Sequence, residues 1–160
     1  GDIIIIDSPT MNSIVDRTNG FLDTIKGHGF NIVAQQDGKG NLQTSMTIVE
    51  DLLQAHSNVV AVFGGNDPTA LGILAAVNAA GLKNTLIYGV DGSPDFKTEL
   101  VKDGSLLRAT GAQSPINIAD KSVEVLYNYL SGKEVDSRYP VQTFLITKDN
   151  VKQYGTDGWQ

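Results

Sequence analysis

Short apolar runs that alternate with stretches of helical periodicity constrain the fold more than any other feature of this sequence. Asp2–Ile6 is a β-branched run of strand length, and residues 12–26 carry apolar side chains at helical spacing. The alternation continues, with strands expected at 31–35, 59–63, 85–90, 106–111 and 141–146 and helices at 41–55, 67–80, 94–102 and 116–130. This order predicts an α/β fold, a doubly wound parallel sheet of about five strands with room for an added edge strand.

Composition excludes several classes of function. The net charge is −6, so nucleic acid is not expected as a partner, because phosphate binding needs a basic face. The chain has no cysteine, which excludes disulfides, thiolate zinc sites and thiol nucleophiles. The longest apolar run, Ile3–Ile6, is far shorter than the roughly 18 residues of a membrane helix. The chain opens on Gly1 rather than Met, which is typical of a processed, tagged or truncated product.

Motifs for catalysis and for cofactors are not found either. The two histidines, His28 and His56, have no third ligand near them in sequence, so no metal site is expected. No glycine-rich loop fits a phosphate-binding motif, and no serine sits in a nucleophile elbow. We therefore expect a protein that is not an enzyme and that needs no cofactor.

Three expected helices begin with a polar residue followed by proline. Asp67-Pro68, Ser93-Pro94 and Ser114-Pro115 each place a capping side chain before a residue that loses no hydrogen bond in the first helical turn. We predict that Asp67, Ser93 and Ser114 cap these helices.

Polar side chains follow the expected strands where each strand ends. Asn66, Asp91 and Gln113 come after the third, fourth and fifth strands, and Arg17 lies in the first helix. Because the carboxyl ends of parallel strands form one edge, these four side chains should converge there. Carboxylate, amide and guanidinium groups together can bind hydroxyls that both donate and accept, as those of a neutral sugar do.

Simpler roles are open for two of these residues. Arg17 could pair with Asp16 or Asp23 on the helix surface. Asp91 could cap the helix that begins near Pro94.

Five segments, in matching order and spacing, resemble the ribose-type binding proteins of ABC importers. They are RTNGF (17–21), VFGGNDPTALG (62–72), GVDGSP (89–94), GAQSP (111–115) and YPV (139–141). The resemblance implies a periplasmic-binding-protein-like fold with flavodoxin-like three-layer lobes. Residues 1–160 would form the C-terminal lobe, so the chain would be a truncated fragment, and 114–140 would be a segment that crosses to the missing N-terminal lobe.

The resemblance also implies roles for four residues. Arg17 matches an arginine that bonds sugar hydroxyls or the ring oxygen, and Asn66 matches a hydroxyl-binding amide. Asp91 matches the carboxylate that takes two hydroxyls. Gln113 matches a glutamine at a hinge crossing that also contacts sugar.

Two positions depart from that family's pattern. Family members often have an aromatic residue where Val90 stands and another near Gly40, and losing both removes stacking surface worth about 1 kcal/mol apiece. Asn41 or Lys39, in the loop around Gly40, could add a polar contact instead. The departures count against ribose itself as the ligand.

The function implied is the substrate-binding component of an ABC sugar importer, binding a monosaccharide or polyol between two lobes. The expected partners are that sugar, the missing lobe and a membrane permease, and the exposed lobe surface favours self-association. The location would be periplasmic, or extracellular and membrane-anchored.

Two rival functions come from other classes. The effector domain of a lactose-repressor-type regulator shares the fold and the R-x-x-G-F pattern, but such regulators usually have a second aspartate where Gly92 stands. A doubly wound enzyme, such as a sugar isomerase or phosphotransferase, would need a general base or a phosphate cradle, which the sequence does not show.

Overall fold

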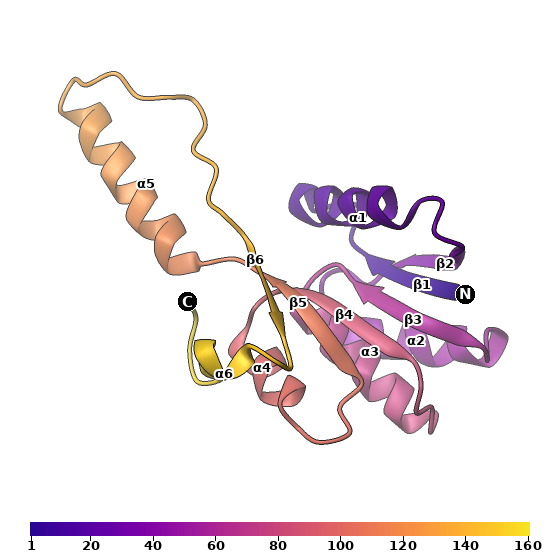
Figure 1. The fold of residues 1–160 in the computed structure, drawn as a ribbon. Helices are drawn as coiled ribbons and strands as arrows, with labels where there is room; N and C mark the ends of the chain where they lie inside the picture. Colours follow the sequence, from indigo (N-terminus) through magenta and orange to yellow (C-terminus); the bar gives the residue numbers. More distant parts are fainter.

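A computed structural model describes all 160 residues as a six-stranded sheet with helices on both faces (Figure 1). The strands are β1 (Asp2–Asp7), β2 (Asn31–Asp37), β3 (Val59–Gly64), β4 (Leu86–Asp91), β5 (Leu107–Ala112) and β6 (Phe144–Thr147). The helices are α1 (Asn12–Ile25), α2 (Leu42–Ala55), α3 (Asp67–Ala79), α4 (Pro94–Leu100), α5 (Pro115–Leu130) and α6 (Val151–Tyr154). None of the helices is both long enough and apolar enough to cross a membrane.

The sheet has the order β2-β1-β3-β4-β5-β6. Strands β1 to β5 are parallel, and β6 pairs antiparallel with β5 at the edge. The chain moves outward from β1 to β2 and then returns to β3 on the other side of β1, so the winding reverses between β1 and β3. The predicted doubly wound sheet with an added edge strand is therefore confirmed.

The two faces of the sheet are covered unequally (Figure 1). Helices α2, α3 and α4 pack on one face, where the main core of 19 buried apolar residues lies. Helix α1 covers the other face, over a small cluster formed by Ile3, Ile5, Ala61 and Phe63. Alternate residues of β1 and β3 point to opposite faces, which is why two strands supply both cores.

Helices α2 and α3 approach each other unusually closely. Gly72 of α3 lies against the first turn of α2, where an added Cβ would be 2.2 Å from the carbonyl oxygen of Leu42. Small residues on both sides of α3 allow this approach, and eight of its residues are buried. The contact fixes how the starts of the two helices sit at the sheet edge.

The C-terminal region continues beyond the last predicted strand. Strand β6 begins at Phe144, three residues after the predicted start, and the short helix α6 follows it. Val151 of α6 is buried in the main core, and Tyr154 stacks on Phe144 with ring centroids 5.1 Å apart. Lys97 of α4 is also buried, and its Nζ donates to the carbonyl oxygen of Gly158 at 2.7 Å. The tail is thus packed onto the sheet edge.

Helix α5 stands away from the rest of the molecule (Figure 1). It contains no buried residue, although its apolar side chains recur at helical spacing. Val123, Leu126, Tyr127 and Leu130 are between 57% and 74% exposed. The segment between α5 and β6 runs back beside the helix, and this connecting segment is the only neighbour of α5 (Figure 1).

Candidate functional site

The carboxyl ends of the strands bring several polar residues to one edge of the sheet. Strand β4 extends one residue further than predicted, so Asp91 is its last residue, and Gln113 follows β5 directly. Asn66 lies two residues beyond β3. Arg17 reaches the same edge from the second turn of α1, where its Nη1 donates to the carbonyl oxygen of Gly65 at 3.0 Å.

The carboxylate of Asp91 is the centre of a polar network. Its Oδ1 is 3.0 Å from Arg17 Nη2 and accepts a hydrogen bond from Gln113 Nε2 at 3.0 Å. Its Oδ2 accepts from the backbone amide of Asp67 at 3.3 Å. The side chains of Arg17 and Asp91 are only 19% and 15% exposed, so this charge-assisted pair is partly shielded from water.

This geometry decides between the roles left open for Arg17 and Asp91. Arg17 pairs with Asp91 across the site rather than with Asp16 or Asp23 on its own helix. Asp91 does not cap α4, because the hydroxyl of Ser93 accepts from the amide of Phe96.

The backbone at Asp91 is strained. Its φ is 146°, a region that residues with a side chain rarely adopt, and such conformations cost about 1–3 kcal/mol. Strain of this kind persists only where the surroundings impose it. The carbonyl of Asp91 accepts from the amide of Gln113 at 3.0 Å, which joins the ends of β4 and β5.

Asn66 is held between two helix starts. Its side-chain Oδ1 accepts from the amide of Thr69 at 2.9 Å and so caps α3, and its Nδ2 donates to the carbonyl oxygen of Gly40 at 3.1 Å. The prediction that Asp67 caps this helix was therefore wrong: Asp67 is already the first helical residue and turns its carboxylate inward. The caps predicted for the next two helices, at Ser93 and Ser114, are confirmed.

The other two predicted site residues differ in their surroundings. Val90 lines a hollow of about 250 Å³ at this edge, together with Arg17, Phe63, Gly111, Gln113 and Thr143. Asn41 instead turns its exposed side chain to the start of α2, where it accepts from the amide of Thr44 at 3.1 Å. The structure thus brings Arg17, Val90, Asp91 and Gln113 together, whereas Asn66 and Asn41 make capping contacts beside them.

Sequence reasoning missed two residues that line this hollow. Phe63 is the next-to-last residue of β3 and stacks on Phe21 of α1, with ring centroids 4.3 Å apart and planes 8° from parallel. Its place at the end of an apolar run on the α1 face could have signalled this. Thr143 arrives from the long connection after α5, and no local pattern in the sequence indicates where it lies.

Asp67 is the site's most buried charged group. It is fully buried, and its carboxylate accepts from Thr110 Oγ1 and from the amide of Ser93, each at 2.7 Å. Burial raises the pKa of Asp67 to about 6, against the two hydrogen bonds, which oppose the shift. Burial likewise lowers the pKa of Lys97.

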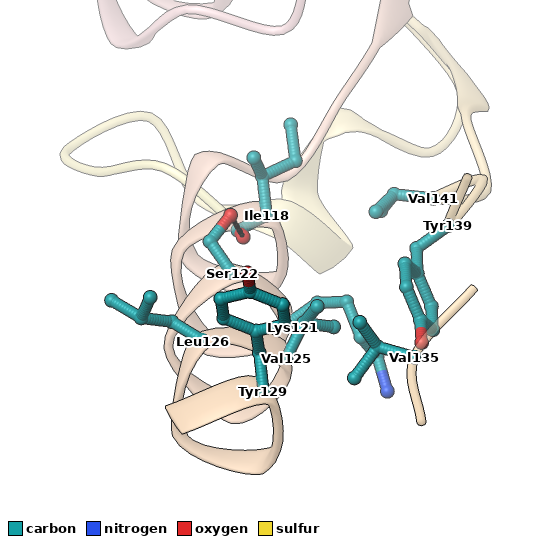
Figure 2. A pocket seen from close by; sticks show the side chains of 9 residues that line it. All are labelled: Ile118, Lys121, Ser122, Val125, Leu126, Tyr129, Val135, Tyr139 and Val141. Atoms are coloured by element: carbon teal, nitrogen blue, oxygen red, sulfur yellow. Dashed lines mark hydrogen bonds between the residues drawn. The ribbon is translucent and has the colours of Figure 1, made fainter. Parts of the chain in front are cut away.

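A second, apolar groove lies between α5 and the segment that returns to β6. Figure 2 shows Val125 of α5 pointing toward Val135 of that segment, and Tyr139 and Val141 of the same segment line the groove beside it. The groove has a volume of about 430 Å³, and seven of its nine lining residues are hydrophobic. It lacks the paired donors and acceptors that hydroxyl binding requires, so the polar edge around Asp91 is the better candidate for a polar ligand.

The side chains at Asp91 can bind hydroxyl groups that both donate and accept hydrogen bonds. Carboxylate, guanidinium and amide groups are present together, but no cluster of three or more acidic or histidine side chains could hold a metal ion. Arg17 and Gln113 both contact the Asp91 carboxylate, and both also line the hollow of about 250 Å³.

The sequence is similar to those of import binding proteins. The sequence profile described as "Periplasmic binding protein domain" matches residues 1–134. The ribose import binding protein RbsB of Salmonella typhimurium is 40% identical over 133 residues, which are 83% of this chain and 44% of that protein. The D-apiose import binding protein of Actinobacillus succinogenes is 31% identical over 142 residues, 86% of this chain and 45% of that protein.

Solved structures agree with the fold. A periplasmic solute binding protein of an ABC transporter from Actinobacillus succinogenes, with bound D-allose, superposes with a TM-score of 0.91 at 25% identity, covering 96% of this chain and 54% of that one. A solute binding protein from Bacillus halodurans with bound myo-inositol gives 0.86 at 28% identity, with coverage of 96% and 54%. The chain therefore spans about half the length of these relatives, and it belongs to the periplasmic binding protein family.

Proposed function

We propose that this chain is the C-terminal lobe of the substrate-binding component of an ABC sugar importer. The observation that supports this most is the Asp91 carboxylate, held by Arg17 and Gln113 at the carboxyl edge of the sheet. In a doubly wound sheet this edge is where ligands bind. The related proteins are import binding proteins with sugar ligands, which favours transport over the repressor-type regulator.

The ligand is a monosaccharide or polyol that completes the hydrogen bonds of this edge. A pair of vicinal hydroxyls can donate to the two oxygens of Asp91, while Arg17 and Gln113 donate to sugar oxygens. The bonds that Arg17 and Gln113 already make to Asp91 hold the three side chains in place. A ligand that replaces these bonds therefore pays a smaller entropic cost of ordering the side chains. Val90 and Phe63 supply the apolar floor of the hollow.

The second wall of the site belongs to an N-terminal lobe. The hollow beside Arg17 and Gln113 has a volume of about 250 Å³, below the roughly 300–1,000 Å³ of ligand pockets, so a sugar on this lobe alone would keep much of its surface in water. A ligand that contacts both lobes stabilises the closed state over the open one. The intact two-lobe protein then delivers the sugar to a membrane permease, outside the cytoplasm, either free in the periplasm or anchored to a membrane.

Residues 114–140 are the segment that crosses to that lobe. Helix α5 has an apolar stripe but no buried residue, and the groove beside it is lined mainly by apolar side chains. Without the other lobe, this surface favours self-association of the chain.

Calorimetric titration with pentoses, hexoses and polyols tests the proposal. We expect micromolar binding by the two-lobe protein, and weak or undetectable binding by residues 1–160 alone. Micromolar binding by this chain would overturn the half-site argument, and a two-lobe protein that binds none of the panel would overturn the function.

The Asp91→Ala variant of the two-lobe protein tests the site itself. Loss of a charged acceptor of two hydroxyls should weaken binding by about a hundredfold, because each hydrogen bond to a charged group contributes about 1.5–3 kcal/mol. Asp103→Ala is the matched control, since Asp103 is exposed in the turn before β5, at the opposite edge of the sheet. Equal affinities in the two variants would remove Asp91 from the site.

A further inference from the structure

The residues around Asp91 include a buried pair that touches no solvent. Asp67 and Thr110 are both fully buried, and Thr110 Oγ1 donates to Asp67 Oδ1 at 2.7 Å. Asp67 begins α3, and Thr110 lies in β5, so the pair joins two elements that flank β4. Neither side chain lines the hollow beside Arg17 and Gln113 or the one that Asp91 lines.

This pair binds the two backbone amides that follow Asp91. The amide of Gly92 donates to Thr110 Oγ1 at 3.1 Å, and the amide of Ser93 donates to Asp67 Oδ2 at 2.7 Å. The backbone amide of Asp67 also donates to the Asp91 carboxylate. Asp91 is thus held on its side chain and on the two peptide groups after it.

The space for this arrangement comes from Gly89. A Cβ at Gly89 would lie 2.5 Å from Asp67 Oδ1, so only glycine lets the buried carboxylate reach the end of β4. Asp67 is not needed as a helix cap, because Asn66 caps α3, so its carboxylate can turn inward. Desolvation of this carboxylate opposes folding, and helix capping does not explain why the charge is buried here.

We propose that Asp67 and Thr110 form a clamp that fixes the strained backbone of Asp91 and so aims its carboxylate at the ligand. The φ of 146° at Asp91 needs a constraint from the surroundings, and the hydrogen bonds to Gly92 and Ser93 provide it. Both are positioning residues, because they act on the ligand through Asp91. The inference rests on the proposed sugar site and adds the means by which its carboxylate is oriented.

A hydroxyl deletion tests the clamp with little change of shape. Thr110→Val removes the group that accepts from Gly92, whereas Thr110→Ser keeps it. In the two-lobe protein we expect the dissociation constant for the best sugar of the panel to rise about tenfold in Thr110→Val and to change less than about twofold in Thr110→Ser. Unchanged affinity in Thr110→Val, even with a lowered melting temperature, would leave the pair a merely structural role and overturn the proposal.

A double-mutant cycle separates action through Asp91 from a general effect on the protein. In an Asp91→Ala background, Thr110→Val should cause no further loss of affinity, because the group that the clamp aims is gone. Losses that add in the double variant would show that Thr110 acts independently of Asp91, which contradicts the clamp.

Residues 1–160 offer a test that does not depend on the sugar. The coupling between the amide proton and Hα of Asp91 is small at a φ of 146° and large for ordinary extended backbone. We expect a small coupling in the wild-type chain and in Thr110→Ser, and a larger one in Thr110→Val. An unchanged coupling in Thr110→Val would overturn the clamp even if the two-lobe protein binds sugar.

The coupling also keeps the two proposals apart. If the two-lobe protein binds no sugar of the panel, the proposed function fails. The proton coupling at Asp91 in residues 1–160 still shows whether the clamp holds that backbone. If Thr110→Val does not fold, Asp67→Ala replaces it, because it removes the oxygen that accepts from the amide of Ser93. A raised coupling at Asp91 in that variant supports the clamp, and a wild-type value contradicts it.

Discussion

The contact between α2 and α3 makes a sharp prediction about Gly72. An alanine Cβ there would lie 2.2 Å from the carbonyl oxygen of Leu42 and 3.1 Å from the amide nitrogen of Met46. Carbon atoms and their neighbours in contact stand roughly 3.5 Å apart, so α2 would have to move by more than about 1 Å. The obstacle is backbone, which cannot turn aside as a side chain can.

The expected cost follows from two opposing terms. Overpacking that moves backbone costs about 1–3 kcal/mol, and a clash with a helix backbone belongs at the upper end of that range. Replacing a helical glycine by alanine returns about 1 kcal/mol of helix propensity. The net loss for Gly72→Ala is therefore about 2 kcal/mol, which lowers the melting temperature of a chain of this size by about 4–8 °C.

Gly20 provides the matched control. It also lies inside a helix, α1, but a Cβ there would meet nothing within 4 Å. Gly20→Ala should gain the propensity term alone, about 1 kcal/mol, and raise the melting temperature by about 2–4 °C. The same substitution is thus expected to act with opposite signs in two helices.

Urea unfolding followed by helical circular dichroism measures both changes. The midpoint should fall for Gly72→Ala and rise for Gly20→Ala at an unchanged slope. Repeating the titration at two protein concentrations shows whether association contributes. A Gly72→Ala chain as stable as the wild type would refute the close approach of α2 and α3.

Three other changes test the charged site and the exposed helix. Because burial raises the pKa of Asp67 from 3.8 to about 6, the chain should lose about 3 kcal/mol of stability, relative to Asp67→Asn, as pH rises from 3 to 7. A difference between the two chains that does not vary with pH in urea titrations would contradict this. Arg17→Lys replaces a guanidinium that binds both Gly65 and Asp91 by an ammonium with a single point of contact. In calorimetry this change should weaken sugar binding by the two-lobe protein about tenfold, and wild-type affinity would argue against the two-point contact. Leu126→Ser should shift residues 1–160 toward monomer in sedimentation velocity, whereas Leu145→Ser, at equal exposure on β6, should not; the reverse result would place association at the sheet edge.

Much of the fold could be predicted because local pattern and tertiary environment agree. The strands lie on the apolar runs, and each expected helix from α1 to α5 is present. The short helix α6 was missed, since four residues are too few to show helical periodicity. It is held by tertiary contacts instead, through buried Val151 and the stacking of Tyr154 on Phe144.

The site could be predicted in its members but not in its connections. The motifs around Arg17 and Asp91 predicted that both lie at one edge, but helix spacing alone left Arg17 free to pair with Asp16 or Asp23. The role of Asp67 was misread because capping rules describe only the helix terminus. The carboxylate of Asp67 lies against Gly89 of β4, Ser93 before α4 and Thr110 of β5, and no single stretch of sequence contains these three.

Helix α5 shows how the site and the rest of the molecule are joined. A helix of this length is marginal in water on its own, so its apolar stripe is understandable only with a covering surface. Its first turn is capped by Ser114, and the residue before that cap, Gln113, donates to the Asp91 carboxylate. A rotation of α5 about this junction would therefore pull on the same hydrogen bond that a sugar at Asp91 must exchange with. We expect ligand binding and the direction of α5 to be coupled for that reason, because the joint and the site share Gln113.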